Sequence, residues 1–397
     1  MASKTTHPLP HPVLSTRALN RATLARQLLL RRAAMSAKDA VTHLVGLQAQ
    51  NVKPPYVQLA ARLDAFDPEE LSGLMASREV GRMVTLRSTI HTHTAEDCLA
   101  LRPFVQPLIE RELRIFRDGL VGVDLDRLAA LSKELVEERP VPLKELKASL
   151  VERWPAADPL ALSVAARCLL PLVQVTPRGL WGHSGQVTLT TAQKWFGAEA
   201  AEAVEAADGR DAATSPGIAP EAAVLRYLAA FGPASVKDMQ TWCRLTRLGP
   251  VFERLRDQLV TFQDEYGVEL FDLPDAPRPD ADTPAPPRFL PEYDNLLLSH
   301  ADRTRVVPFE YRKRTWNGNQ GYRTFLVDGF LAGIWRLEDG AEGDGHGTLT
   351  VQAFGGLTRA QRDAVAEEGV RMLGSLSSAT SPSYAVRFAD FSGPAAK

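Results

Sequence analysis

The sequence has few of the residues that mark a disulfide-rich, metal-binding or membrane-spanning protein. Its 397 residues include three cysteines, Cys98, Cys168 and Cys243, which lie far apart and form no Cys-x-x-Cys pair. This spacing argues against a disulfide framework or a zinc finger, and it predicts a reducing, cytoplasmic environment. No hydrophobic run is long enough to cross a bilayer, and the N-terminus lacks the apolar stretch of a secretory signal.

Negative charge is absent from the first 38 residues, although the whole chain carries a net charge of −2. The near-neutral total argues against a nucleic-acid packaging protein, but it allows a basic groove that is balanced by acidic segments elsewhere. Two basic clusters are present. Each alone is most simply a solvated face, and together they would line a groove if the fold brings them side by side. The clusters are Arg17, Arg21, Arg26, Arg31, Arg32 and Lys38, and Arg303, Arg305, Arg312, Lys313, Arg314 and Arg323.

One pattern of helices and strands recurs three times along the chain. Each repeat has a helix, a second helix with a clear start, a further helix and two short strands. The second helices start at 36–39, 142–145 and 235–238, where Ser36 and Ser235 suit an N-cap and Pro142 suits a first helical turn. This order is typical of a winged helix-turn-helix, so the sequence predicts an α+β fold with about three such motifs in tandem. The strand pairs are expected at 83–87 and 89–94, 172–176 and 186–191, and 260–264 and 268–272.

The repeats and a proline-rich segment divide the chain into six predicted parts. Residues 1–12 are expected to form a disordered tail and 276–287 an exposed linker. The three winged-helix units are predicted at 13–120, 121–215 and 216–275. A small β-rich C-terminal domain is predicted at 288–397, with strands at 289–298, 305–308, 325–328, 330–337, 348–354 and 383–391 and a helix at 358–373.

Two glutamines, Gln48 and Gln50, flank Ala49 at the predicted exit of the second helix of the first unit. The segment 53–55, Lys-Pro-Pro, then breaks the helix. Residues two apart on a helix do not share a face, but a bend at the helix exit would let both amides converge. Glutamine pairs are common on protein surfaces, so the motif needs its context to be specific.

Seven stretches spread over the chain supply that context. They are VLSTRALNRATLARQLLLRR (13–32), LVGLQAQNVKPPYVQLAARL (44–63), MVTLRSTIHTHTAED (83–97), QVTPRGLWGHSG (174–185), RYLAAFGPASVKDMQ (226–240), RFLPEYDNLLLSHADRTR (288–305) and FLVDGFLAGIWR (325–336). In these stretches the chain resembles the AlkZ-like winged-helix DNA glycosylases. The functional motif of that family is Gln, an aliphatic residue, then Gln, or Asp in a sister branch. The resemblance therefore implies that Gln48 and Gln50 are the catalytic pair.

The chemistry of a cationic lesion suits two amides. Alkylation at guanine N7 or adenine N3 leaves a positive charge, so the base departs without strong general-acid help. The enzyme must then stabilise an oxocarbenium-like sugar and place a water, which a glutamine carbonyl can do although it is no general base. The resemblance and this chemistry predict a monofunctional DNA glycosylase that acts on alkylpurines in double-stranded DNA, including bulky N7-guanine adducts and interstrand crosslinks. No metal or organic cofactor is expected.

Further polar residues are candidate DNA contacts. His91 and His93 alternate on a predicted strand near Thr89. A third metal ligand is missing from this group, so a wing that touches DNA is the favoured interpretation. Lys53 is expected to contact a phosphate rather than form a Schiff base. The remaining candidates are Arg17, Arg21, Asn295, His300, Arg303 and Arg305.

Two other functions fit parts of the pattern. A non-catalytic winged-helix regulator or lesion sensor would read base edges with a recognition helix, and it has no need of paired amides. A protein-interaction scaffold would show no salt-dependent affinity for DNA. The paired amides favour the enzyme, which we expect to be a monomer.

Overall fold

The computed structural model describes residues 12–197, 200, 217–317 and 320–391, and the first eleven residues of the predicted tail lie outside them. The fold is mixed α+β, as predicted, and the order of helices followed by a β-hairpin occurs three times.

The first repeat contains α1 (Thr16–Arg26), α2 (Ala37–His43), α3 (Pro54–Arg62), α4 (Pro68–Ala76), β3 (Val80–Val84) and β4 (Ile90–Thr94). The second contains α7 (Leu125–Glu138), α8 (Leu143–Arg153), α9 (Pro159–Leu169), β6 (Leu172–Gln174) and β7 (Thr188–Thr191). The third contains α12 (Pro220–Phe231), α13 (Val236–Cys243), α14 (Gly249–Arg254), β8 (Val260–Asp264) and β9 (Glu269–Asp272).

The second helices begin where the capping signals place them. The Ser36 hydroxyl accepts a hydrogen bond of 3.0 Å from the Asp39 backbone N–H. Ser235 and Asp238 form a complete capping box, in which each side chain binds the backbone N–H of the other residue. Pro142 occupies the N-cap position of α8. Side-chain capping therefore accounts for the starts at Ser36 and Ser235, whereas Pro142 makes no capping hydrogen bond.

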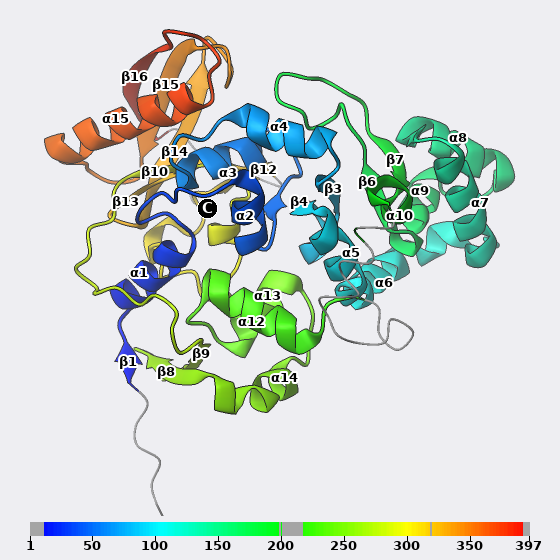
Figure 1. Cartoon of the computed structure of the whole chain (residues 1–397), viewed down its shortest axis with the longest axis horizontal. Helices are drawn as coiled ribbons and strands as arrows, with labels where there is room; N and C mark the ends of the chain where they lie inside the picture. The colour runs from blue at the N-terminus through cyan, green and yellow to red at the C-terminus, as the bar shows by residue number, and fades with distance from the viewer. Residues whose placement is uncertain (1–11, 198–199, 201–216, 318–319, 392–397) are drawn as a thin grey trace, which may run out of the picture.

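The hairpins of the first two repeats are not separate wings, because they join in one six-stranded sheet of order β2-β4-β3-β6-β7-β5. Its edge strands are β2 (Leu47–Gln48) and β5 (Val141–Pro142). The join is the antiparallel pairing of β3 with β6, which sets Arg82 opposite Gln174. Helices α5 (Ala95–Phe104), α6 (Gln106–Ile115) and α10 (Ala192–Phe196) complete this half. In Figure 1 the second repeat forms the right end of the molecule, and α2, α3 and α4 lie near the centre.

The N-terminal segment ties the first repeat to the third. Strand β1 (Val13–Leu14) pairs in parallel with β8, and Arg26 of α1 forms a buried ion pair of 2.8 Å with Asp272. The segment 276–287 has no helix or strand, but it is held against α1, since Arg17 donates to the Ala281 carbonyl and Arg21 to the Thr283 carbonyl.

The C-terminal part is a five-stranded sheet of order β10-β13-β14-β15-β16, covered by α15 (Figure 1). Its elements are β10 (Arg288–Leu290), β13 (Thr324–Val327), β14 (Phe330–Glu338), β15 (His346–Ala353), α15 (Arg359–Ser375) and β16 (Ser383–Asp390), and a small pair, β11 (Trp316–Asn317) and β12 (Gln320–Gly321), lies apart. Apolar residues of α15 and the sheet share one core with α2 and α3.

Two predicted strands of this part were wrong. The strand expected at 289–298 stops at Leu290, because Asp294 caps a short 3-10 turn at Asn295–Leu297. No strand forms at 305–308.

Candidate active site

A tight turn carries the chain from α2 into β2 and so positions the glutamines. Gly46 has φ +88°, and a Cβ atom there would lie 2.2 Å from the His93 ring, so only glycine fits. Leu47 and Gln48 then pair with Thr92 and His91 of β4, and the Ala49 N–H donates to the Ile90 carbonyl. The predicted helix exit is therefore wrong, since the helix ends at His43, Gln48 lies in the edge strand β2 and Gln50 lies in the bend that follows it.

The two amides differ in exposure and in partners. Gln48 is 4% exposed, and its Oε1 accepts a hydrogen bond of 2.7 Å from Arg87 Nη2. Its backbone carbonyl accepts another from Gln58. Among the described residues the Gln48 side-chain N–H groups have no acceptor. Gln50 is exposed, and its Oε1 accepts a long bond of 3.3 Å from the Ile90 N–H.

Arg87 is the residue that sequence reasoning missed at this site. It lies in the turn between β3 and β4 with φ 55°, and its Nη2 also approaches Asn295 Oδ1 at 3.2 Å and His91 Nε2 at 3.1 Å. Nη1 donates to the Trp242 carbonyl. Burial lowers the pKa of Arg87 to about 10, which still leaves the guanidinium charged at neutral pH. A cation is thus directed at the oxygen of the Gln48 amide.

The histidines of β4 are internal rather than DNA-facing, which corrects the prediction for His91 and His93. His91 Nδ1 lies 3.0 Å from the Thr89 carbonyl and so carries the proton, which leaves Nε2 free to accept from Arg87. Burial and the charge of Arg87 lower the His91 pKa well below 6.5, and burial lowers that of His93 to about 4. Both rings are fully buried, stacked and neutral. They support the strand that holds Gln48.

The loop after β10 clamps the glutamine segment from the C-terminal part. Asn295 Nδ2 donates to the Gly46 carbonyl at 2.7 Å, and Asp294 forms a bidentate ion pair with Arg62 of α3 at 2.7 and 2.9 Å. Glu292 accepts from Asn51 at 2.8 Å, directly after the second glutamine. The sequence predicted only a DNA contact here, at Asn295, and did not predict the contacts of this loop with the glutamine segment. Its density of acidic and amide residues next to a strand was the available signal.

Most predicted DNA contacts are buried and bound internally, and the structure corrects them. Arg21 is fully buried and binds Asp328, Arg305 lies 3.8 Å from Asp238 and donates to the Pro233 carbonyl, and His300 bonds to the Phe231 carbonyl. Asn295 is also buried. The fold does bring the two basic clusters together, because Asn20 donates to the Arg305 carbonyl, but it does so in the interior. Arg21 and Arg26 of the first cluster are paired in the interior with Asp328 and Asp272.

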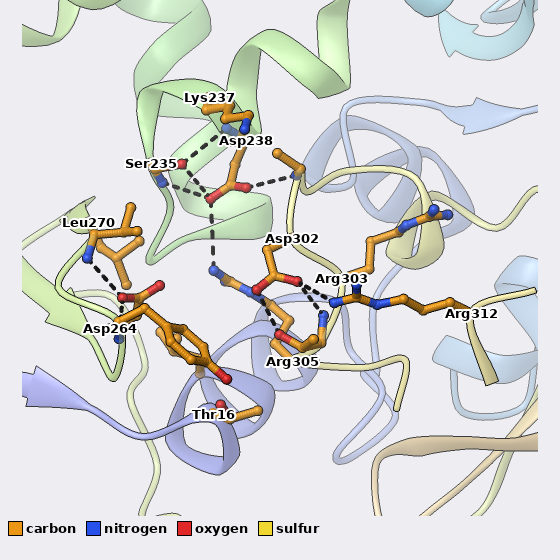
Figure 2. A pocket seen from close by; sticks show the side chains of 15 residues that line it. Thr16, Ser235, Lys237, Asp238, Asp264, Leu270, Asp302, Arg303, Arg305 and Arg312 are labelled. Carbon is orange, nitrogen blue, oxygen red and sulfur yellow. Dashed lines mark hydrogen bonds and ion pairs between the residues drawn. The ribbon is translucent and has the colours of Figure 1, made fainter. Parts of the chain in front are cut away.

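Three candidates keep some exposure. Arg17 is 38% exposed in its side chain but pairs with Asp328 at 2.6 Å. Arg303 lines a polar cavity of about 470 Å³ together with Lys237 and Arg312. Figure 2 shows this cavity, with Arg305 reaching toward Asp238 and Arg312 toward Asp302. Thr89 lines a different, apolar cavity of about 370 Å³, and Gln50 lies at the rim of the same cavity.

Comparison with known proteins identifies the family. The family model described as DNA glycosylase AlkZ-like matches residues 41–374. The chain belongs to the AlkZ-like DNA glycosylase family. An interstrand DNA cross-link repair glycosylase from Streptomyces sahachiroi is 25% identical over 339 residues, which cover 80% of this chain and 86% of that protein. The structure of the S. sahachiroi DNA glycosylase AlkZ superposes with a TM-score of 0.72 at 21% identity, covering 95% of this chain and 100% of that one.

The match confirms the predicted family and enzyme class, and it sets aside the regulator and the scaffold. Among the described residues there is no cluster of three or more His, Cys, Asp or Glu side chains suited to a metal ion. No helix in that part of the chain has the length and hydrophobicity needed to cross a membrane.

Proposed function

We propose that this glycosylase hydrolyses the N-glycosidic bond of cationic alkylpurines in double-stranded DNA, with Gln48 and Gln50 as its catalytic pair. The observation that carries the proposal is the polarised Gln48 amide beside an exposed Gln50. The S. sahachiroi relative is named as a cross-link repair glycosylase, and we extend the substrate range here to bulky N7-guanine adducts and interstrand crosslinks.

The two amides make different hydrogen bonds to the same water molecule. Because Arg87 occupies the Gln48 oxygen, the amide hydrogens of Gln48 face outward and hold the oxygen of the water. The Gln50 carbonyl accepts a hydrogen bond from the same water and turns its dipole toward the sugar. When the C1′–N9 bond breaks, its electron pair stays with the base and neutralises the alkylated ring. The water oxygen bonds to C1′ and its proton passes to solvent.

The reaction ends at an abasic site, because Lys53, the lysine next to the glutamine motif in the sequence, is paired with a carboxylate. Lys53 forms an ion pair of 3.1 Å with Glu342, which also binds Arg323, so its ammonium group is held away from a Schiff-base role. We further propose that the three helix–hairpin repeats are winged-helix motifs that bind the DNA duplex.

The test is release of the base from a duplex that carries one N7-methylguanine. We expect strand cleavage only after heat or alkali, and no protein–DNA adduct on borohydride treatment. A uracil duplex is the matched control, since its neutral leaving group needs stabilisation that these amides do not supply. Equal release of N7-methylguanine by wild type and a Gln48→Ala, Gln50→Ala double variant would contradict the proposal.

A further inference from the structure

An apolar cavity of about 370 Å³ adjoins Gln50 and has no part in the hydrolysis described above. One wall is the β3–β4 hairpin, which contributes Val84 and Ile90. The opposite wall belongs to the second repeat, with Leu160 and Val164 on α9 and Leu189 on β7. The cavity is therefore formed between two repeats and opens beside the catalytic amides.

The polar groups of the lining point to a particular kind of ligand. The Gln174 Oε1 atom is buried and has no hydrogen-bond partner in the described structure. Such an acceptor costs free energy unless a ligand donates to it. Arg167 is the one charged residue of the lining, and Glu112 neutralises it at 2.6 Å. The lining thus offers mostly apolar surface, a few hydroxyl and amide groups and one buried acceptor without a partner, and its one cation is already paired.

We propose that this cavity receives an apolar, aromatic substituent carried on N7 of guanine, and that Gln174 accepts a hydrogen bond from an N–H or O–H of that substituent. The proposal rests on the function proposed above. In a purine, N7 and N9 are separated by C8 alone, so an N7 substituent begins beside the bond that breaks. With the sugar at the amides, the substituent extends toward this cavity, because Gln50 is one of its lining residues.

The dimensions and chemistry favour this occupant over an extruded base. Small-molecule sites are concave and mostly apolar with a few placed polar groups, and this cavity lies at the small end of their range. A pocket for an extruded purine needs several donors and acceptors along the base edge. The lining of this cavity is instead hydrophobic for the larger part, with residues such as Ile90, Leu160 and Leu189.

The test fills the cavity and compares two substrates. Ser163 lines it from α9, and its hydroxyl bonds only to the Leu160 carbonyl of the same helix, so Ser163→Phe occupies space at small cost to the fold. The control is Ala148→Phe at an exposed position of α8 outside the cavity. The substrates are duplexes with one N7-methylguanine or one N7-(biphenyl-4-ylmethyl)guanine, each corrected for depurination without enzyme.

We expect Ser163→Phe to lower kcat/KM about tenfold for the biphenyl adduct and to leave N7-methylguanine within about twofold of wild type. Ala148→Phe should leave both unchanged. Adding a phenolic hydroxyl to the biphenyl group should improve kcat/KM for wild type but not for Gln174→Met. Equal losses on both substrates, or no loss on either, would overturn the proposal.

A failure of the proposed function gives a different result. In that case wild type releases neither base. Equilibrium binding of the two duplexes then tests the cavity proposal separately. If the cavity receives the substituent, Ser163→Phe weakens binding of the biphenyl duplex and leaves binding of the N7-methylguanine duplex unchanged. The same affinity for both duplexes in wild type and variant overturns the cavity proposal independently.

Discussion

Arg87 Nη2 donates a hydrogen bond of 2.7 Å to Oε1 of Gln48, and this contact leaves the amide hydrogens of Gln48 for another partner. The same nitrogen lies near His91 and Asn295, so three acceptors converge on a group that has two hydrogens. The orientation of Gln48 therefore depends on His91, which must stay neutral to accept from Arg87, and on Asn295, which also contacts Arg87.

The first prediction concerns Arg87 as a positioning residue. Arg87→Met should lower kcat for N7-methylguanine by about tenfold to a hundredfold while KM and DNA affinity change little, because an oriented group is lost in the transition state. Arg87→Lys should restore part of the rate, since an ammonium group also donates to Oε1. If the fall in kcat parallels a fall in melting temperature, and Arg87→Lys restores none of the rate, Arg87 has a structural role only.

The second prediction separates the two glutamines. Each single alanine variant should lose about 10²–10³-fold in excision rate with DNA affinity retained. Gln48→Glu should be as impaired as Gln48→Ala, because the new carboxylate binds Arg87 and donates no hydrogen bond. Gln50→Glu keeps an acceptor at the exposed position and should remain more active than Gln50→Ala. Single-turnover rates of the four variants decide this, and the reverse order would refute the division of roles.

The third prediction concerns DNA affinity. Binding should be independent of sequence and weaken steeply with salt, as expected when cations displace counterions from phosphates. Arg303→Glu should weaken binding and reduce the salt slope by about 1. Arg305→Glu should instead destabilise the fold, because Arg305 is buried beside Asp238. Titrations at several salt concentrations, with melting curves for both variants, provide the check. A salt-independent affinity would contradict a phosphate-binding surface.

The fourth prediction concerns pH and stability. Burial lowers the folded-state pKa of His93 to about 4, so the unfolded chain binds a proton more readily between pH 6.5 and 4. The free energy of unfolding should therefore fall as pH drops through this window, by up to about 3 kcal/mol from His93 alone. Urea denaturation at pH 7.5, 6 and 5 measures the slope. His93→Gln should make it shallower, and an unchanged slope would assign the effect to other groups such as His300.

The fold was predictable from the sequence where local chemistry determines it. Capping by Ser36 and Ser235 and the alternation of apolar residues in the strands need no distant partner. The position of Gln48 was not predictable in this way. The same short segment can leave a helix or enter a strand, and pairing with β4, more than 40 residues later, decides between them. A contact between distant parts of the chain has no local signature.

The same reason explains the failed DNA contacts. Arginines in a run without acidic residues look like a phosphate-binding surface, yet Arg21 and Arg26 pair with Asp328 and Asp272, which lie more than 240 residues away. Arg87 was missed because its role depends on Gln48 and Asn295 meeting in space. The glutamines themselves came from the resemblance, which supplied the context that their spacing lacks.

The pairing of β3 with β6 has a consequence for how such an enzyme can diversify. It joins a repeat that carries Gln48, Gln50 and Arg87 to a repeat that carries none of them. Mutations in the second repeat can therefore reshape the cavity that Gln50 lines while Gln48, Gln50 and Arg87 stay unaltered. Adaptation to a new genotoxin would then require substitutions in the second repeat only. The same positions could be randomised in the laboratory without changing Gln48, Gln50 or Arg87.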